Sequence, residues 1–160
     1  MSDLEYMKLA FLEAKKAFLK GEVPIGAIVV VNNKVISKAH NLRHTKRQVL
    51  YHAEVLAISK ACKKLKRWIL DDATIYVTVE PCLMCSGVIM QARMKKIVYG
   101  LKEEKFGAIN SVIDVNKCEF NHKVEVVSGL YEEEIKNLMQ SFFKKIRKEK
   151  ADEDRKYSNK

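Results

Sequence analysis

The sequence lacks any long apolar run, and this absence excludes a membrane-spanning protein. Hydrophobic residues make up 48% of the chain, yet no stretch approaches the roughly 20 consecutive apolar residues that a spanning helix needs. The first residues, MSDLEYMKLA, are acidic and amphipathic, which is not the pattern of an export or transit signal. We therefore expect a cytoplasmic protein that makes no use of a membrane.

Cysteine and acidic residues are also scarce. The four cysteines are Cys62, Cys82, Cys85 and Cys118, and a reducing compartment argues against pairing them in disulfides. The chain has thirty Lys and Arg residues but only twenty Asp and Glu residues, which gives a net charge of +10. Such a surplus is typical of proteins that bind polyanions, although many basic proteins bind none. Charge alone leaves both possibilities open.

Periodicity predicts one α/β domain over residues 1–150, without repeats or linkers, followed by a polar, frayed tail at 151–160. A chain of this length fits a single domain with a substantial core. Strand–helix–strand alternation predicts parallel neighbouring strands with helices on both faces of the sheet. The expected elements are a helix between Ser2 and Gly21, a hairpin around Asn32-Asn33, helices at 52–65 and 84–94, strands at 73–79, 95–100 and 123–129, and a last helix from about residue 131.

Possible metal ligands occur at the beginnings of two predicted helices. His52 begins one, and Cys82 and Cys85 begin the next. A helix N-terminus lowers thiol pKa values and so favours the thiolates that a metal needs. One imidazole and two thiolates are the ligand count of a catalytic zinc site, in which the fourth position stays open. Cys62 and Cys118 have no partner at ligand spacing, so we expect one Zn²⁺ per chain at an open site.

Glu54 adds a proton carrier to this pattern. Zinc lowers the pKa of its bound water, and a neighbouring carboxylate can pass the proton to a leaving group. Helical residues two apart do not share a face, so spacing alone does not show that His52 and Glu54 converge. Each motif taken singly has an ordinary explanation: a core or redox Cys pair, a helix-end His, and a solvated Glu. Their joint occurrence favours a catalytic metal site.

The motifs HAE and PCLMC resemble the H-x-E…P-C-x-x-C signature of zinc-dependent nucleobase deaminases. Further segments resemble the bacterial tRNA adenosine deaminases from residue 4 to about residue 150. The resemblance implies a three-layer α/β/α sandwich around a mixed five-stranded sheet, as in cytidine deaminases, and a homodimer. It also implies conversion of the wobble adenosine of a tRNA anticodon to inosine. The segments that carry it are GEVPIGAIVV, AHNLR, HAEVLAI, IYVTVEPCLMCSG, RMKKIVYG, FNHKVEVVSG and SFFKKIRK.

The same resemblance implies roles for individual residues. Glu54 would shuttle protons, and Asn41 would contact the flipped nucleoside. One departure leaves the substrate identity open: Val49-Leu50-Tyr51 stands where the family usually has Pro-Thr-Ala. The zinc ligands would be His52, Cys82 and Cys85, and the backbone at Ala53, Glu80 and Pro81 would line the pocket around the base.

A basic segment near the C-terminus bears on the choice of substrate. Lys144, Lys145, Arg147 and Lys148 are expected to hold the backbone of a tRNA anticodon stem-loop, although such a run can also be a solvated helix face. A deaminase of a free base or nucleoside, of the guanine or cytosine type, would need no such surface. A zinc-stabilised RNA-binding module without turnover would need no Glu54. Both alternatives remain beside the tRNA reading.

Overall fold

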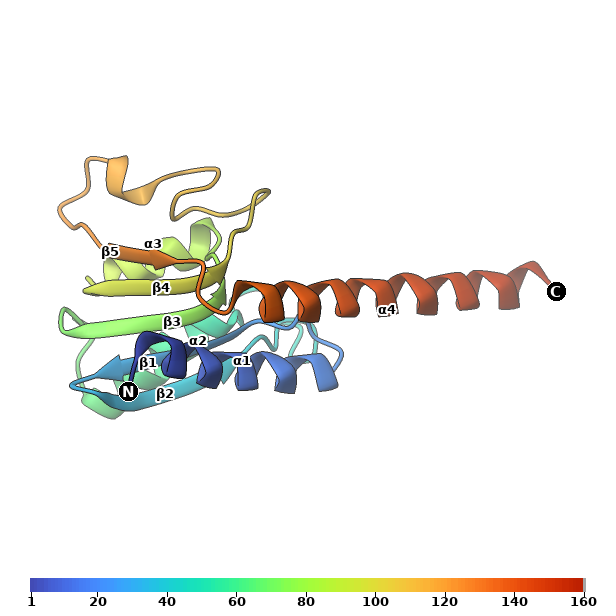
Figure 1. Cartoon of the computed structure of the whole chain (residues 1–160), viewed down its shortest axis with the longest axis horizontal. Helices are drawn as coiled ribbons and strands as arrows, with labels where there is room; N and C mark the ends of the chain where they lie inside the picture. Colours follow the sequence, from blue (N-terminus) through green and yellow to red (C-terminus); the bar gives the residue numbers. More distant parts are fainter. Residues whose placement is uncertain (160) are drawn as a thin grey trace.

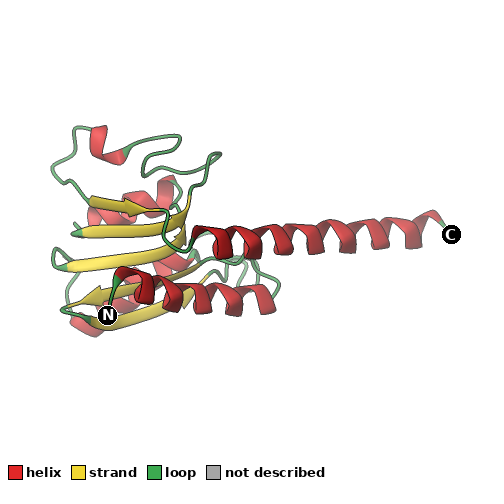
Figure 2. Cartoon of the chain, viewed as in Figure 1, coloured by secondary structure: helices red, strands yellow, loops and turns green. Residues whose placement is uncertain are grey.

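The computed structural model describes residues 1–159 as four α-helices and five strands (Figures 1 and 2). The expected elements are all present, with ends shifted by a few residues. In chain order they are α1 (Asp3–Leu19), β1 (Gly26–Val31), β2 (Lys34–His40), α2 (Ala53–Leu65), β3 (Ala73–Val79), α3 (Leu83–Gln91), β4 (Lys96–Leu101), a 3₁₀ turn (Val115–Lys117), β5 (Glu125–Ser128) and α4 (Glu132–Ser158).

The five strands form one mixed sheet in the order β2-β1-β3-β4-β5. Strand β1 runs antiparallel to both β2 and β3, whereas β3, β4 and β5 are parallel. The hairpin between β1 and β2 turns at Asn32 and Asn33, with φ of 50° and 61°. Asn tolerates this left-handed conformation, which the tightest hairpin turns require. The predicted hairpin and mixed sheet are therefore confirmed.

Helices cover both faces of the sheet, as Figure 1 shows. Alternate side chains of β1 point to opposite faces, so Ile28 packs beneath α1 while Val29 packs beneath α2 and α3. Met7 of α1 and Ile135 of α4 complete one apolar layer, and Ile89 of α3 belongs to the other. The three-layer α/β/α sandwich of the cytidine deaminase type is confirmed.

Helix α4 continues well beyond the edge of the sheet (Figure 1). Only Ile135 and Phe142 of its 27 residues are buried. The expected frayed tail is wrong for residues 151–158, which are helical. Asp152 precedes Lys156 by four residues, a spacing at which opposite charges stabilise a helix. The positive charges of Arg155 and Lys156 also stabilise the helix, because its C-terminal end carries partial negative charge. This helix is long but highly charged, and nothing in residues 1–159 forms a helix suited to crossing a membrane.

Candidate active site

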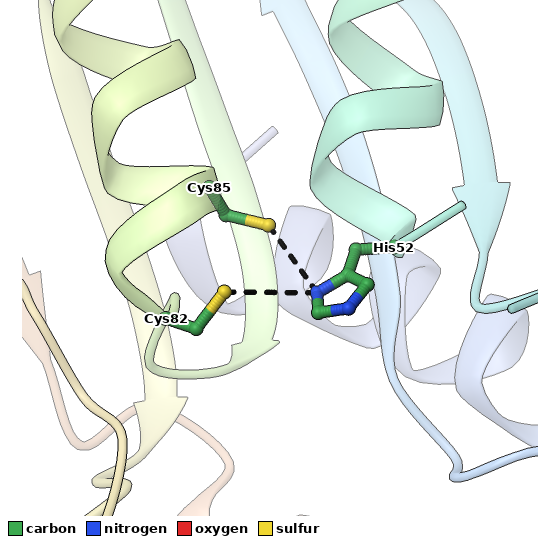
Figure 3. Close-up of side chains that lie close together, drawn as sticks. All are labelled: His52, Cys82 and Cys85. Atoms are coloured by element: carbon green, nitrogen blue, oxygen red, sulfur yellow. Dashed lines mark hydrogen bonds between the residues drawn. The ribbon is translucent and has the colours of Figure 1, made fainter. Parts of the chain in front are cut away.

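The N-termini of α2 and α3 meet at one place, and three side chains converge there (Figure 3). His52 and Cys82 are the N-cap residues of the two helices, and neither side chain caps its own helix. Instead His52 Nδ1 lies 3.7 Å from Cys82 Sγ and 3.5 Å from Cys85 Sγ. The ligand atoms of the three residues all lie within 4.8 Å of one another. The fold therefore brings His52 and Cys82 together, although they are thirty positions apart in the sequence.

These separations fit a tetrahedral metal ion. Bonds of about 2.0–2.3 Å at tetrahedral angles hold nitrogen and sulfur ligands about 3.4–3.8 Å apart. The two measured nitrogen–sulfur distances, 3.7 and 3.5 Å, lie in that range. The cluster is thus preorganised for an ion, and three protein ligands leave one position open.

The protonation of the cluster also suits a cation. Hydrogen bonding with Cys85 lowers the pKa of Cys82 to about 4, despite partial burial. The same contact and burial raise the pKa of Cys85, because two adjacent thiols do not ionise independently. Hydrogen bonding to Cys82 raises the pKa of His52. Cation binding would displace the protons that these groups retain.

Glu54 converges with the cluster, which its spacing from His52 could not show. The carboxylate is only 3% exposed, and its Oε2 accepts a hydrogen bond from Cys85 Sγ at 3.1 Å. Burial raises the pKa of Glu54 above the ordinary range of a carboxyl group. At the first turn of α2, residues two apart thus reach the same cavity. A buried carboxylate with a raised pKa is suited to taking up and returning a proton.

A small cavity of about 120 Å³ opens onto this cluster. Asn41 lines it and is itself held in place: its Nδ2 donates to Val23 O at 3.3 Å, and its Oδ1 accepts from the Arg43 N–H at 3.1 Å. Sequence reasoning missed Val23, Ile25 and Arg43 as lining residues, although they lie in the quoted segments GEVPIGAIVV and AHNLR. The full lining is Val23, Ile25, Asn41, Arg43, His52, Ala53 and Glu54.

Glu80 has a side-chain role that the sequence did not reveal. It is 3% exposed, and its Oε2 accepts from the N–H groups of Ile109, Asn110 and Ser111 at 3.2, 3.0 and 3.0 Å. The N–H of Glu103 and the hydroxyl of Ser111 donate to the other oxygen. The carboxylate therefore holds the loop 103–111 rather than facing the cavity.

That loop packs directly against the start of α3. Gly107 pairs with Cys82, and the Ala108 N–H donates to Pro81 O at 2.9 Å. A Cβ at Gly107 would lie 2.5 Å from Glu80 Cδ, so only glycine permits this approach. Glu80 and Pro81 thus shape the wall beside Cys82, outside the lining of the 120 Å³ cavity.

The four cations expected to bind RNA lie along α4, and none of them lines the 120 Å³ cavity. Lys145 Nζ sits 5.6 Å from the centre of the Phe18 ring. Arg147 lines a cavity of about 730 Å³ between α4 and residues 101–106. Phe142 and Ile146 face a groove beside Asn41. Lys144 and Lys148 each follow one of these two residues by two positions, so their side chains point away from that groove. The structure does not gather the four at the cavity.

The departure at Val49-Leu50-Tyr51 leaves the cavity lining unaltered. Val49 is 67% exposed and Leu50 is 51% exposed, so these apolar side chains face solvent. None of the three lines the cavity next to His52.

Comparison with known proteins identifies the family. The family model described as MafB19-like deaminase matches residues 1–147. The tRNA-specific adenosine deaminase of Bacillus subtilis (strain 168) is 49% identical over 146 residues, which cover 91% of each chain. This chain belongs to the tRNA-specific adenosine deaminase family. The resemblance seen in the sequence is confirmed.

Solved structures of deaminases support the same assignment. One, from studies of A-to-I editing by tRNA:A34 deaminases at the wobble position of transfer RNA, has a TM-score of 0.81 and 37% identity, covering 84% of this chain and 98% of its own. A guanine deaminase from Bacillus subtilis has a TM-score of 0.62 and 31% identity, covering 78% and 83%. This member of the tRNA-specific adenosine deaminase family thus agrees better with the tRNA-acting structure.

We predict that Glu80→Gln lowers the free energy of unfolding by about 2–4 kcal/mol at pH 7, because one acceptor atom is lost from a buried, charge-assisted network. Burial alone would raise the pKa of Glu80, but the hydrogen bonds from Asn110, Ser111 and Glu103 together lower it. A lowered folded-state pKa stabilises the protein above the unfolded pKa, so the difference from wild type should shrink below about pH 4. Urea unfolding measures both effects.

The exposed Glu104 in the same loop provides the matched control, Glu104→Gln. Amide hydrogen exchange at Ile109, Asn110 and Ser111 should accelerate in Glu80→Gln and stay at the wild-type rate in Glu104→Gln. Equal protection in the two variants would show that Glu80 does not hold the loop.

Proposed function

We propose that this protein converts the wobble adenosine of a tRNA anticodon to inosine. The observation that carries this proposal is the meeting of His52, Cys82 and Cys85 with the buried Glu54 at one cavity. The tRNA-specific relative and the tRNA:A34 deaminase structure support adenosine in RNA as the target. Water replaces the amino group at C6 of the base, and ammonia leaves.

His52, Cys82 and Cys85 would hold one Zn²⁺ per chain, with the fourth position open. Zinc, when bound there, supplies a water of lowered pKa. Glu54 would take the proton of that water and deliver it to the departing amino group, which its burial and raised pKa support. Asn41 would hold the nucleoside and the backbone at Ala53 would line the cavity around the base, while Glu80 and Pro81 would shape the neighbouring wall beside Cys82.

A tRNA anticodon loop is the substrate that this surface favours. A base must leave its stack to reach an enclosed cavity, and a loop base does so at little cost. The net charge of +10 suits a polyanion, and Lys144, Lys145, Arg147 and Lys148 would add phosphate contacts along α4. A free-base deaminase of the guanine type is the second candidate, favoured only by the lower structural match reported above. A tRNA substrate favours a cytoplasmic location.

We also propose a homodimer formed through the outer face of α3. Trp68 is 63% exposed and Leu83 is 62% exposed, and they flank an apolar cavity of about 370 Å³ that also includes Met90 and Phe120. Contiguous exposed apolar surface of this kind marks an interaction site. Gly87 lies in the same cavity, and a Cβ there would meet nothing within 4 Å.

Removing one proposed ligand should remove the metal. We expect Cys85→Ala to lose most of its zinc, because two ligands cannot hold the ion against water. Cys118→Ala, which changes a thiol outside the cluster, should keep one zinc per chain. Elemental analysis measures the zinc content of the two purified variants. Equal zinc content in both would refute the assignment of Cys85 as a ligand.

Glu54→Gln should keep zinc and fold but slow deamination by about 10²–10⁴-fold, because an amide cannot shuttle the proton. The measurement is single-turnover conversion of adenosine to inosine in a tRNA anticodon stem-loop, read by sequencing, with zinc content determined in parallel. Loss of zinc would instead make Glu54 a ligand. Wild-type protein that leaves the stem-loop unchanged while deaminating guanine would refute the tRNA assignment.

The proposed interface is testable at Gly87. Gly87→Glu places a charge in the apolar cavity without a clash in the protomer, so it should dissociate the dimer to the chain mass of 18.4 kDa. Gly87→Ala, which adds no charge, should remain dimeric. Light scattering at micromolar concentration compares the two, and an unchanged mass for Gly87→Glu would place the interface elsewhere.

A further inference from the structure

A cationic loop, residues 43–47, lies beside the cavity and has no part in the proposed chemistry. It contains Arg43, Lys46 and Arg47, and no acidic residue occurs anywhere in positions 41–51. All three cationic side chains are exposed. The ion pairs found in residues 1–159 include none of them. The only acidic side chain bonded to this loop in the described residues, Glu22, accepts backbone N–H groups and leaves the three cationic side chains without an ion-pair partner.

The cationic loop borders the 120 Å³ cavity through Arg43. Arg43 lines the 120 Å³ cavity together with His52 and Glu54. It also lines a surface depression of about 490 Å³, whose other walls are His44, Thr45 and Arg47. The cavity of the proposed reaction and the depression thus share Arg43 as a wall, and Arg47 adds a second cation to the depression.

The backbone of this loop is fixed in place. Glu22, only 1% exposed, accepts the N–H of His44 at 2.9 Å and of Thr45 at 3.1 Å. The Lys46 N–H donates to Leu42 O at 3.0 Å. Arg47 has a φ of 51°, a left-handed conformation that closes a turn in the loop. A preorganised cationic loop loses little entropy when an anion binds.

We propose that the cationic loop is a phosphate-binding site that holds the RNA backbone at the nucleotide whose base enters the cavity. The proposal rests on the proposed function. A nucleotide bound by its base carries a phosphate on each side of its ribose, and these phosphates lie at the cavity mouth. Arg43 and Arg47 present guanidinium groups, which pair with phosphate through two parallel hydrogen bonds. Lys46 supplies a third charge.

The test removes two charges from the loop and keeps its backbone. Lys46→Gln with Arg47→Asn is the variant, because Asn tolerates the left-handed conformation at position 47. The matched control is Lys63→Ala with Lys64→Ala, which removes the same charge from exposed positions at the far end of α2. Both are made in the zinc-loaded full chain carrying Glu54→Gln, so that binding of a labelled anticodon stem-loop is measured without turnover.

Two lost phosphate contacts should lower the slope of log K against log salt by about 1.4 and weaken binding by about 10–30-fold at 0.1 M salt. The control pair should keep the wild-type slope. An unchanged slope for the loop variant, or an equal fall for the control, overturns the proposal. Duplex DNA is a second arm: an equal loss of affinity there would make the loop a general polyanion surface and contradict a role at the flipped nucleotide.

Failure of this site is distinguishable from failure of the proposed function. If the protein deaminates the stem-loop but binds it equally well with and without the two loop charges, the proposed function stands and the phosphate-binding site is refuted. If the protein neither binds nor deaminates the stem-loop, both the proposed function and the phosphate-binding site are refuted.

Discussion

The meeting of two helix N-termini is the constraint on which the rest of the site depends. Strand β3 leads directly into α3, and a loop after β2 leads into α2, so His52 and Cys82 begin their helices side by side. Hydrogen bonds from Cys85 and His52, which this meeting brings within reach, lower the pKa of Cys82 and favour its thiolate. The sheet order, with β1 and β3 adjacent, brings these two helix starts together. The fold itself therefore brings the proposed metal ligands together.

Two buried carboxylates hold the loops on either side of this meeting point. Glu22 accepts backbone N–H groups of the cationic loop, and Glu80 accepts those of the loop 103–111. Each binds main-chain donors that no helix or strand would satisfy, which fixes loop geometry more firmly than side-chain packing alone. The two loops beside the helix starts are thus each held by a buried carboxylate.

The sequence predicted what depends on local pattern and missed what depends on distant contacts. Apolar periodicity and the Asn32-Asn33 turn identified the helices and the hairpin, and the motifs located His52, Cys82 and Cys85. The carboxylate contacts of Glu80 span more than twenty residues, so no local spacing could reveal them. The frayed tail was a misjudgement of a different kind, because opposite charges four residues apart favour a helix even in the exposed segment 151–158.

The position of the cations matters more than their number. A net charge of +10 attracts RNA from any direction, but it does not choose which nucleotide enters a cavity of about 120 Å³. Cations along α4 lie on a projecting helix outside the cavity lining, so they would add affinity without choosing the base that enters. Arg43 lies at the cavity itself, and phosphate contacts at that point fix register. A cation beside the cavity would therefore contribute to selecting the base, and a cation far along the helix would contribute to capture of the RNA.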